Sequence, residues 1–284
     1  MRKISFLAII FLLLIVSCTS QPEYMRDPTG KIGVISDIHG DLDNVKFFVD
    51  QFNEEKVDMI LVLGDINDMN NDVDDYQEIY DILEYVAQNF IFDIYVIPGN
   101  HESTEDYYNV MDSHVRRYEG FHDLSDWKIA EDDLTIVPVP GYHDEDYMNS
   151  DGFLFFTEDL MDLETRIQNM SNILIMSHTP PKGKTQQSID VTFFGENVGN
   201  LMLDQMMRKH DIKFSVSGHI HEAGMKAVDE DDNLVPENTW SETLRLNPGS
   251  ATRWKMLDGS ISEGSAAILE IKDGMARYEI LRIP

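Results

Sequence analysis

The stretch KIGVISDIHG, residues 31–40, decides how this chain folds. Its first six residues are mostly apolar and predict a short β-strand, and Asp37 and His39 follow directly where that strand ends. Residues two apart on an extended segment point to the same side, so both side chains can face one site. Gly40 then lets the backbone turn away sharply. The stretch therefore predicts a strand that delivers a carboxylate and an imidazole to its carboxyl end.

The segments that follow alternate between strand and helix patterns. Apolar runs predict buried strands at 59–63, 92–97, 134–139, 173–176 and 213–217, and helical spacing predicts helices at about 43–56, 73–89, 158–170 and 196–209. Shorter runs between turn sequences at 222–282 predict antiparallel strands. Strands that alternate with helices in this way predict an α/β fold, in which helices pack on a sheet with parallel crossovers.

Four further motifs repeat the pattern of polar groups just after a strand, where open α/β sheets bind ligands. They are Gly64-Asp65-Ile66-Asn67-Asp68, Gly99-Asn100-His101-Glu102, Ser177-His178-Thr179-Pro180 and Gly218-His219-Ile220-His221. The five motifs together supply seven candidate metal ligands: Asp37, His39, Asp65, Asn100, His178, His219 and His221. Carboxylate oxygen, amide oxygen and imidazole nitrogen suit Mn, Fe or Zn. The sequence therefore predicts one shared metal site, in which a carboxylate such as Asp65 can bridge two cations.

The first 17 residues resemble a targeting segment. A cationic start precedes an apolar run at 4–16 that is too short for a membrane span. Ile15-Val16-Ser17-Cys18 then resembles the lipobox of bacterial lipoproteins, and Cys18 is the one cysteine of the chain. We therefore expect a lipoprotein signal peptide at 1–17, a lipidated tether at 18–30 and a membrane-anchored, extracytoplasmic domain at 31–284. An ordinary cleaved signal and an uncleaved anchor are the alternatives.

The charge of the chain limits its partners. It has 22 Lys and Arg against 52 Asp and Glu, a formal net charge of −30. Nucleic acids are bound through clusters of Lys and Arg, so a duplex partner is not expected. A small phosphate ester is still compatible with this charge, because bound cations can be the largest local charges in a site.

The motifs resemble those of the calcineurin-like metallophosphoesterase superfamily over about residues 31–282. Asp-x-His, Gly-Asp-x-x-Asp, Gly-Asn-His-Glu, a single His and Gly-His-x-His occur here in the family's order. The segments His-Thr-Pro-Pro at 178–181, Gly-His-Ile-His-Glu at 218–222 and Asn-Pro-Gly-Ser at 247–250 resemble small Icc-like phosphoesterases. The resemblance implies a four-layer α/β/β/α sandwich.

The resemblance also implies a role for each site residue. Asp37, His39 and His221 would bind a first divalent metal ion, and Asn100, His178 and His219 a second. Asp65 would bridge them, and a hydroxide between the metals would be the nucleophile. His101 would be the family's histidine that is not a ligand and lies near the scissile phosphate, where it can stabilise the transition state or protonate the leaving oxygen.

The expected function is therefore dinuclear-metal-dependent hydrolysis of phosphate esters, with small phosphodiesters as the first choice. Phosphomonoester or nucleotide hydrolysis and a non-catalytic metal-binding lipoprotein are the alternatives. Glu102 could orient His101 or could be an ordinary acid at a helix start. Segments 103–118, 140–153 and 179–195 are expected to be loops that line the substrate pocket.

Overall fold

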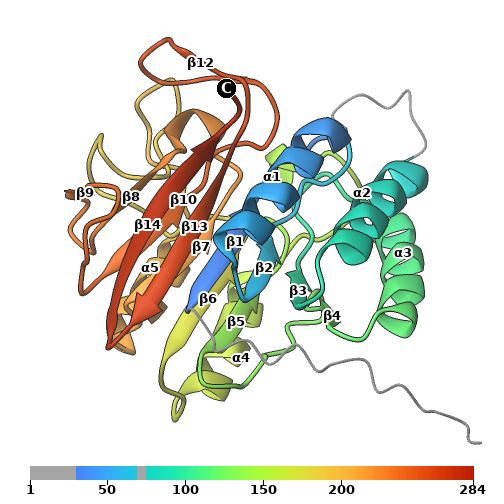
Figure 1. The fold of residues 1–284 in the computed structure, drawn as a ribbon. Coiled ribbons are helices and arrows are strands. Elements are labelled where there is room, and N and C mark those ends of the chain that lie inside the picture. The colour runs from blue at the N-terminus through green and yellow to red at the C-terminus, as the bar shows by residue number, and fades with distance from the viewer. Residues whose placement is uncertain (1–29, 69–74) are drawn as a thin grey trace, which may run out of the picture.

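The computed structural model describes residues 30–68 and 75–284. Two six-stranded sheets lie face to face, and helices cover the outer side of each (Figure 1). The expected lipid attachment site Cys18, the signal peptide, and the start of the helix predicted at 73 fall outside the described residues. None of the described helices is long and apolar enough to cross a membrane.

The first sheet has the strand order β14-β13-β1-β2-β3-β4. Its central strands are parallel, whereas β13 pairs antiparallel with both β1 and β14. The helices α1, α2 and α3 lie on its outer face. The bounds are β1 (Lys31–Ile35), β2 (Met59–Val62), β3 (Asp93–Val96), β4 (Phe121–Asp123), β13 (Ser265–Lys272), β14 (Met275–Arg282), α1 (Leu42–Glu55), α2 (Asp75–Asn89) and α3 (Thr104–Arg117).

The second sheet has the strand order β5-β6-β7-β10-β8-β9. The tail was expected to be antiparallel, and this is wrong for β10, which runs parallel to β7. The chain reaches β10 after the β8–β9 hairpin and so returns in the same direction as β7. The bounds are β5 (Thr135–Val139), β6 (Ile173–Ser177), β7 (Phe214–Ser217), β8 (Lys226–Val228), β9 (Leu234–Val235), β10 (Leu244–Asn247), α4 (Thr157–Ile167) and α5 (Leu201–Lys209).

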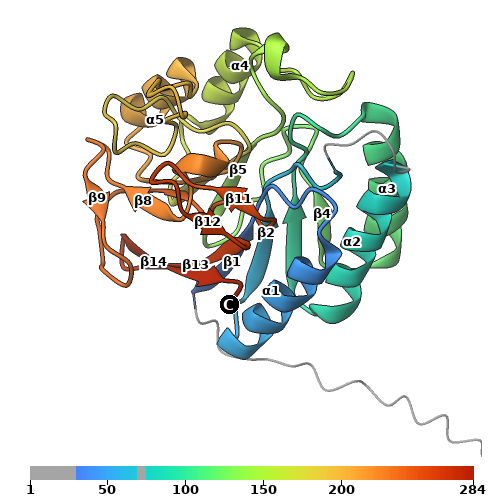
Figure 2. The same cartoon turned by 90° about the horizontal axis from the view of Figure 1, so that it is seen from above.

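Three separate apolar layers hold these elements together. The first packs α1, α2 and α3 on the first sheet, and includes Phe48 and Phe52 of α1. The second fills the space between the sheets, and the third packs α4 and α5 on the second sheet. Seen from above, α1, α2 and α3 lie on one side of the sheets and α4 and α5 on the other (Figure 2). Three buried layers between four layers of structure confirm the predicted α/β/β/α sandwich.

One helix was missed, because 103–118 was expected to be a loop. Ser103 caps α3 by accepting a hydrogen bond from the backbone N–H of Asp106, as helix N-caps commonly do. The buried face of α3 includes Tyr107 and His114. These residues weaken the apolar period on which helix prediction relies.

Three short elements complete the described chain. The 3₁₀ helices η1 (Glu145–Tyr147) and η2 (His221–Ala223) and the small hairpin of β11 (Trp254–Lys255) and β12 (Ile261–Ser262) all belong to long connections. Each of them lies near the carboxyl ends of the strands, where the predicted site residues are found.

Candidate metal centre

The loops after β2 and β3 touch each other beneath the site. A Cβ atom on Gly64 would lie 2.2 Å from the backbone nitrogen of Gly99, so only glycine allows this approach. The fully buried carboxylate of Glu102 accepts hydrogen bonds from the backbone N–H groups of Ile66 and Gly99. One side chain therefore joins the loop that carries Asp65 to the loop that carries Glu102 itself.

The first group of donors comes from three loops. Asp37, His39, Asp65 and His221 each offer one atom, and these atoms all lie within 4.8 Å of one another. Nε2 of His221 is 3.0 Å from Oδ1 of Asp37 and 3.3 Å from Nε2 of His39. All four side chains are buried. The predicted first ligand set, Asp37, His39 and His221, is thus brought together next to Asp65.

The second group shares Asp65 with the first. Asp65, His178 and His219 again offer atoms within 4.8 Å of one another. Oδ1 of Asn100 lies between the two rings, 2.9 Å from Nε2 of His178 and 2.8 Å from Nδ1 of His219. The structure therefore brings all seven predicted ligands into two adjoining groups, and Asp65 is at their junction.

The hydrogen bonds of the second group turn one ring nitrogen of His178 toward the oxygen atoms of two neighbouring side chains. Nδ1 of His178 donates to the carbonyl oxygen of Leu63 at 2.8 Å, so Nε2 is the ring atom that a bound cation would contact in place of a proton. That atom faces two acceptors, Oδ1 of Asn100 at 2.9 Å and Oδ2 of Asp65 at 3.3 Å. The amide nitrogen of Asn100 is occupied by the carbonyl of Tyr147. Converging acceptors of this kind fit a divalent cation.

The pKa values of the site residues follow from burial and opposite charge. Burial lowers the pKa of His39 to about 4, so its ring is unprotonated at neutral pH. Burial raises the pKa of Asp37, but His221 and His178 together lower it to about 2. Burial lowers the pKa of His178, but Asp65 and then Asp37 raise it to about 9. The two aspartates are therefore ionised and attract positive charge into the site.

Four of the site residues have a backbone conformation that is unfavourable for most side chains. Asp37, His39, Asp65 and His219 have φ angles of 53°, 45°, 51° and 66°. A non-glycine residue in this left-handed region costs of order 1–3 kcal/mol, and such residues cluster at functional sites. The strain is retained because each loop is held by other contacts, such as the bond from the Ser250 hydroxyl to the carbonyl of Asp37.

His101 lies beside the first group. Its ring centroid is 4.9 Å from that of His39, and its Nε2 is 3.8 Å from Oδ2 of Asp65. The side-chain nitrogen of Asn149 is 2.7 Å from the same Nε2 atom. The carbonyl of Tyr147, the last residue of η1, also accepts a hydrogen bond from Asn100 at 2.8 Å. The segment at 147–149 therefore contacts both His101 and Asn100.

Sequence reasoning missed two of these supporting residues. Asn149 belongs to no recognisable sequence motif, and only its distance to His101 in the structure shows that it supports the site. Glu102 was considered as a partner of His101 or as a helix-start acid, but it binds the backbone of Ile66 and Gly99 instead. Its burial was the missing information, because an acid next to a candidate ligand has no distinctive sequence pattern.

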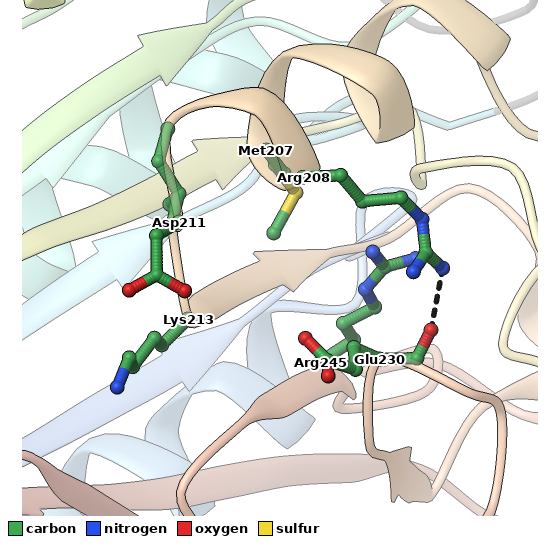
Figure 3. A pocket seen from close by; sticks show the side chains of 7 residues that line it. Met207, Arg208, Asp211, Lys213, Glu230 and Arg245 are labelled. Carbon is green, nitrogen blue, oxygen red and sulfur yellow. Dashed lines mark hydrogen bonds between the residues drawn. The ribbon is translucent and has the colours of Figure 1, made fainter.

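Two cavities lie elsewhere, at the amino ends of the strands. One of about 230 Å³ is lined by Arg208, Arg245 and Glu230 among others, and Arg208 donates to the carbonyl oxygen of Glu230 there (Figure 3). A cleft of about 1070 Å³ opens between the sheets beside Tyr95. Neither contains any of the predicted site residues. Parallel sheets bind ligands at the other end, so the donor cluster is the stronger candidate for the functional site.

Comparison with known proteins identifies the family to which the chain belongs. The sequence model of the family described as calcineurin-like phosphoesterase matches residues 30–223. The chain belongs to this family, and the predicted superfamily is confirmed. An uncharacterised protein of Methanocaldococcus jannaschii is 23% identical over 214 residues, which cover 73% of this chain and 87% of that protein.

Solved structures agree on the fold. The protein TT1561 of Thermus thermophilus has a TM-score of 0.62 and 13% identity, and the match covers 89% of this chain and 99% of that one. A dimetal phosphatase from Danio rerio has a TM-score of 0.56 and 14% identity, over 91% of this chain and 100% of that one. The family and the donor cluster together indicate a phosphoester hydrolase that uses divalent metal ions.

Proposed function

We propose that this protein hydrolyses small phosphodiesters with two divalent cations, Mn, Fe or Zn. One observation carries the proposal: two groups of donors, all buried except the half-buried His219, share a single carboxylate, Asp65. In this assignment Asp37, His39 and His221 hold one cation and Asn100, His178 and His219 the other. The Danio rerio protein of similar fold is described as a dimetal phosphatase, which supports a proposal of two cations.

Each side chain has a part in this proposal. Cations held there would lower the pKa of water and neutralise phosphoryl oxygens, which is the chemistry of two-metal hydrolases. His101 would donate a proton to the leaving oxygen or stabilise the transition state, work that typically contributes 10²–10⁴-fold. Asn149 would keep its ring in position, and Glu102 would fix the loops on which Asp65 and Asn100 are carried.

A preference for diesters has a physical basis in the surroundings of the site. A monoester phosphate carries up to two negative charges and is commonly clamped by Arg or Lys. In the described part of the chain no hydrogen bond or ion pair joins a Lys or Arg to any of the seven candidate ligands. A singly charged diester makes the smaller electrostatic demand. It therefore suits a site whose candidate ligands have no such contact with Lys or Arg in the described part of the chain.

The remaining proposals concern location and partners. We propose that Cys18 carries a lipid and anchors the domain to a membrane outside the cytoplasm, as the lipobox-like sequence suggests. The partner is then a small phosphate ester. A chain with a net charge of −30 is not expected to bind duplex nucleic acid.

The function is tested with two nitrophenyl substrates. The full chain is treated with a chelator, reloaded with Mn, Fe or Zn, and assayed on bis(4-nitrophenyl) phosphate and 4-nitrophenyl phosphate. We expect metal to restore turnover and the diester to have the higher kcat/KM. A higher value for the monoester would move the function to phosphomonoesters or nucleotides. Absence of turnover with every metal and both substrates would favour a non-catalytic metal-binding protein.

A further inference from the structure

Apolar side chains are exposed in three segments that border the donor cluster. Twelve large hydrophobic side chains are exposed in the described part of the chain. Five of them belong to these segments: Tyr147, Phe193, Phe194, Leu257 and Ile261, and Phe194 is 91% exposed. Single exposed apolar residues are ordinary, but a group of them at one place indicates contact with an apolar partner. We call these five residues the apolar rim.

Glu222 connects two parts of the apolar rim to the site. This residue directly follows the candidate ligand His221. Its carboxylate accepts a hydrogen bond from the backbone N–H of Phe193 at 3.1 Å, and its carbonyl accepts from Leu257 at 3.2 Å. The turn at 192–195 and the β11–β12 hairpin are therefore fixed to the same backbone that carries a candidate ligand.

Aromatic rings continue this surface inward to the donors. Trp254 of β11 lies edge to face against His221, with 4.3 Å between ring centroids. The ring of Tyr147 is 6.3 Å from that of His219, and Tyr142 lies closer, at 3.9 Å. Aromatic rings therefore contact a histidine of each donor group, and one of these rings, Tyr147, belongs to the apolar rim.

We propose that the substrate is an amphipathic phosphate ester, whose phosphate meets the donor cluster while a hydrocarbon chain lies on the apolar rim. This inference rests on the proposed function. Leu257 and Ile261 are aliphatic and gain by burying hydrocarbon, whereas a nucleobase would gain most from stacking and from hydrogen bonds to its edges. Metal ions would attract only the phosphate, so apolar contact is the source of affinity for the rest of the ester on this acidic chain.

The test is a series of 4-nitrophenyl alkyl phosphates with chains from methyl to octyl, used below micelle-forming concentrations. The leaving group is constant, so chain length alone changes. A fully buried methylene increases affinity roughly fourfold, and half-exposed methylenes less. We expect KM of the metal-loaded full chain to fall about twofold or more per methylene over several carbons.

Variants show whether the apolar rim causes this trend. Phe193→Ser with Phe194→Ser, and separately Leu257→Ser with Ile261→Ser, should flatten the dependence of KM on chain length. Ile91→Ser and Leu234→Ser are matched controls, because these residues are 72% and 53% exposed and lie on the α2–β3 connection and on β9. The control variants should keep the wild-type dependence on chain length.

The outcomes separate the two proposals. Turnover of every ester with a KM that ignores chain length would overturn the apolar rim as a substrate surface and leave the hydrolase intact. A nucleoside nitrophenyl phosphate with a lower KM than the octyl ester would likewise overturn it, in favour of base stacking. Absence of turnover of the methyl ester with every metal would remove the proposed function, and this inference with it.

Discussion

The amide of Asn149 lies 2.7 Å from Nε2 of His101 and holds that ring at the edge of the donor cluster. An amide can donate to an unprotonated ring nitrogen or, turned over, accept from a protonated one. Asn149 can therefore keep the ring in place in both protonation states. It is a positioning residue, because it acts through His101.

Replacement of Asn149 should therefore slow the reaction without removing metal. We expect Asn149→Ala to lower kcat by about tenfold, since even small displacements of a catalytic group reduce rates strongly. Ser150→Ala is the matched control, because Ser150 binds the carbonyl of Glu102 and not His101. Asn149→Gln should recover part of the rate. Equal losses in Asn149→Ala and Ser150→Ala would show that the loop matters only as a whole.

His101 itself should be needed for rate and not for metal. Its Nε2 is 3.8 Å from Asp65, and it belongs to neither donor group. We expect His101→Ala to retain its metal content by elemental analysis while kcat falls by about 10²-fold or more. The loss should be smaller for a nitrophenol than for an alcohol as leaving group, if proton donation is its role. Loss of metal with a normal rate per bound metal would assign His101 to the ligands.

Asp65 should matter for both metal ions. It is the one residue shared by the two donor groups, and its neighbours His178 and His101 keep its pKa well below the usual range although burial raises it. Wild type should approach two equivalents of metal, and Asp65→Asn should lower the affinity for both. Asp37→Asn is the comparison, because Asp37 belongs to the first group only. A wild-type stoichiometry fixed at one in saturating metal would contradict the two-metal assignment.

Glu102 should be needed for stability as well as for rate. Its carboxylate is fully buried and accepts from two backbone N–H groups, whereas an amide would turn a donor toward one of them. A buried donor without an acceptor costs about 1–3 kcal/mol, so Glu102→Gln should lower the free energy of unfolding by that amount, measured by denaturant titration. Glu105→Gln, at an exposed position in the first turn of α3, should be neutral. Similar stability of the two variants would contradict a stabilising role for the hydrogen bonds that the Glu102 carboxylate accepts.

The lipid is predicted from sequence alone. In a bacterial host that lipidates other proteins, a fatty-acid probe should label the wild type and not Cys18→Ser. One acyl chain binds membranes weakly, so stable anchoring should come with several chains. An unlabelled wild type in that host would leave an ordinary signal or an uncleaved anchor.

Local patterns predicted most of the fold and the composition of the site. The buried strands are short apolar runs, and polar residues just after them can be recognised without knowing which strands are neighbours. The meeting of Asp37 with Asp65 could then be expected, because the parallel strands β1 and β2 end at one edge of the same sheet. The meeting of Asp37 with His221 depends in addition on how the two sheets stack. The contact between Asn149 and His101 could not be expected, because it depends on the path of an irregular loop.

Two other features of the fold could not be predicted from the sequence, for similar reasons. The parallel direction of β10 depends on the β8–β9 hairpin that precedes it, and a strand pattern does not contain its direction. The helix α3 buries Tyr107 and His114, which are weak apolar signals. In each case a tertiary contact, and not local preference, decides the structure.

The pairing of β1 with β13 has a consequence for how the protein is made. Val34 lies opposite Ala267, and the backbone N–H of Ala251 donates to the carbonyl of Ser36 just before Asp37. The first described strand therefore gains its second neighbour only when the last part of the chain has left the ribosome. Until then β1 has an unpaired edge, which can associate with other chains. A product shortened before β13 would keep this edge of β1 unpaired and would be prone to aggregation.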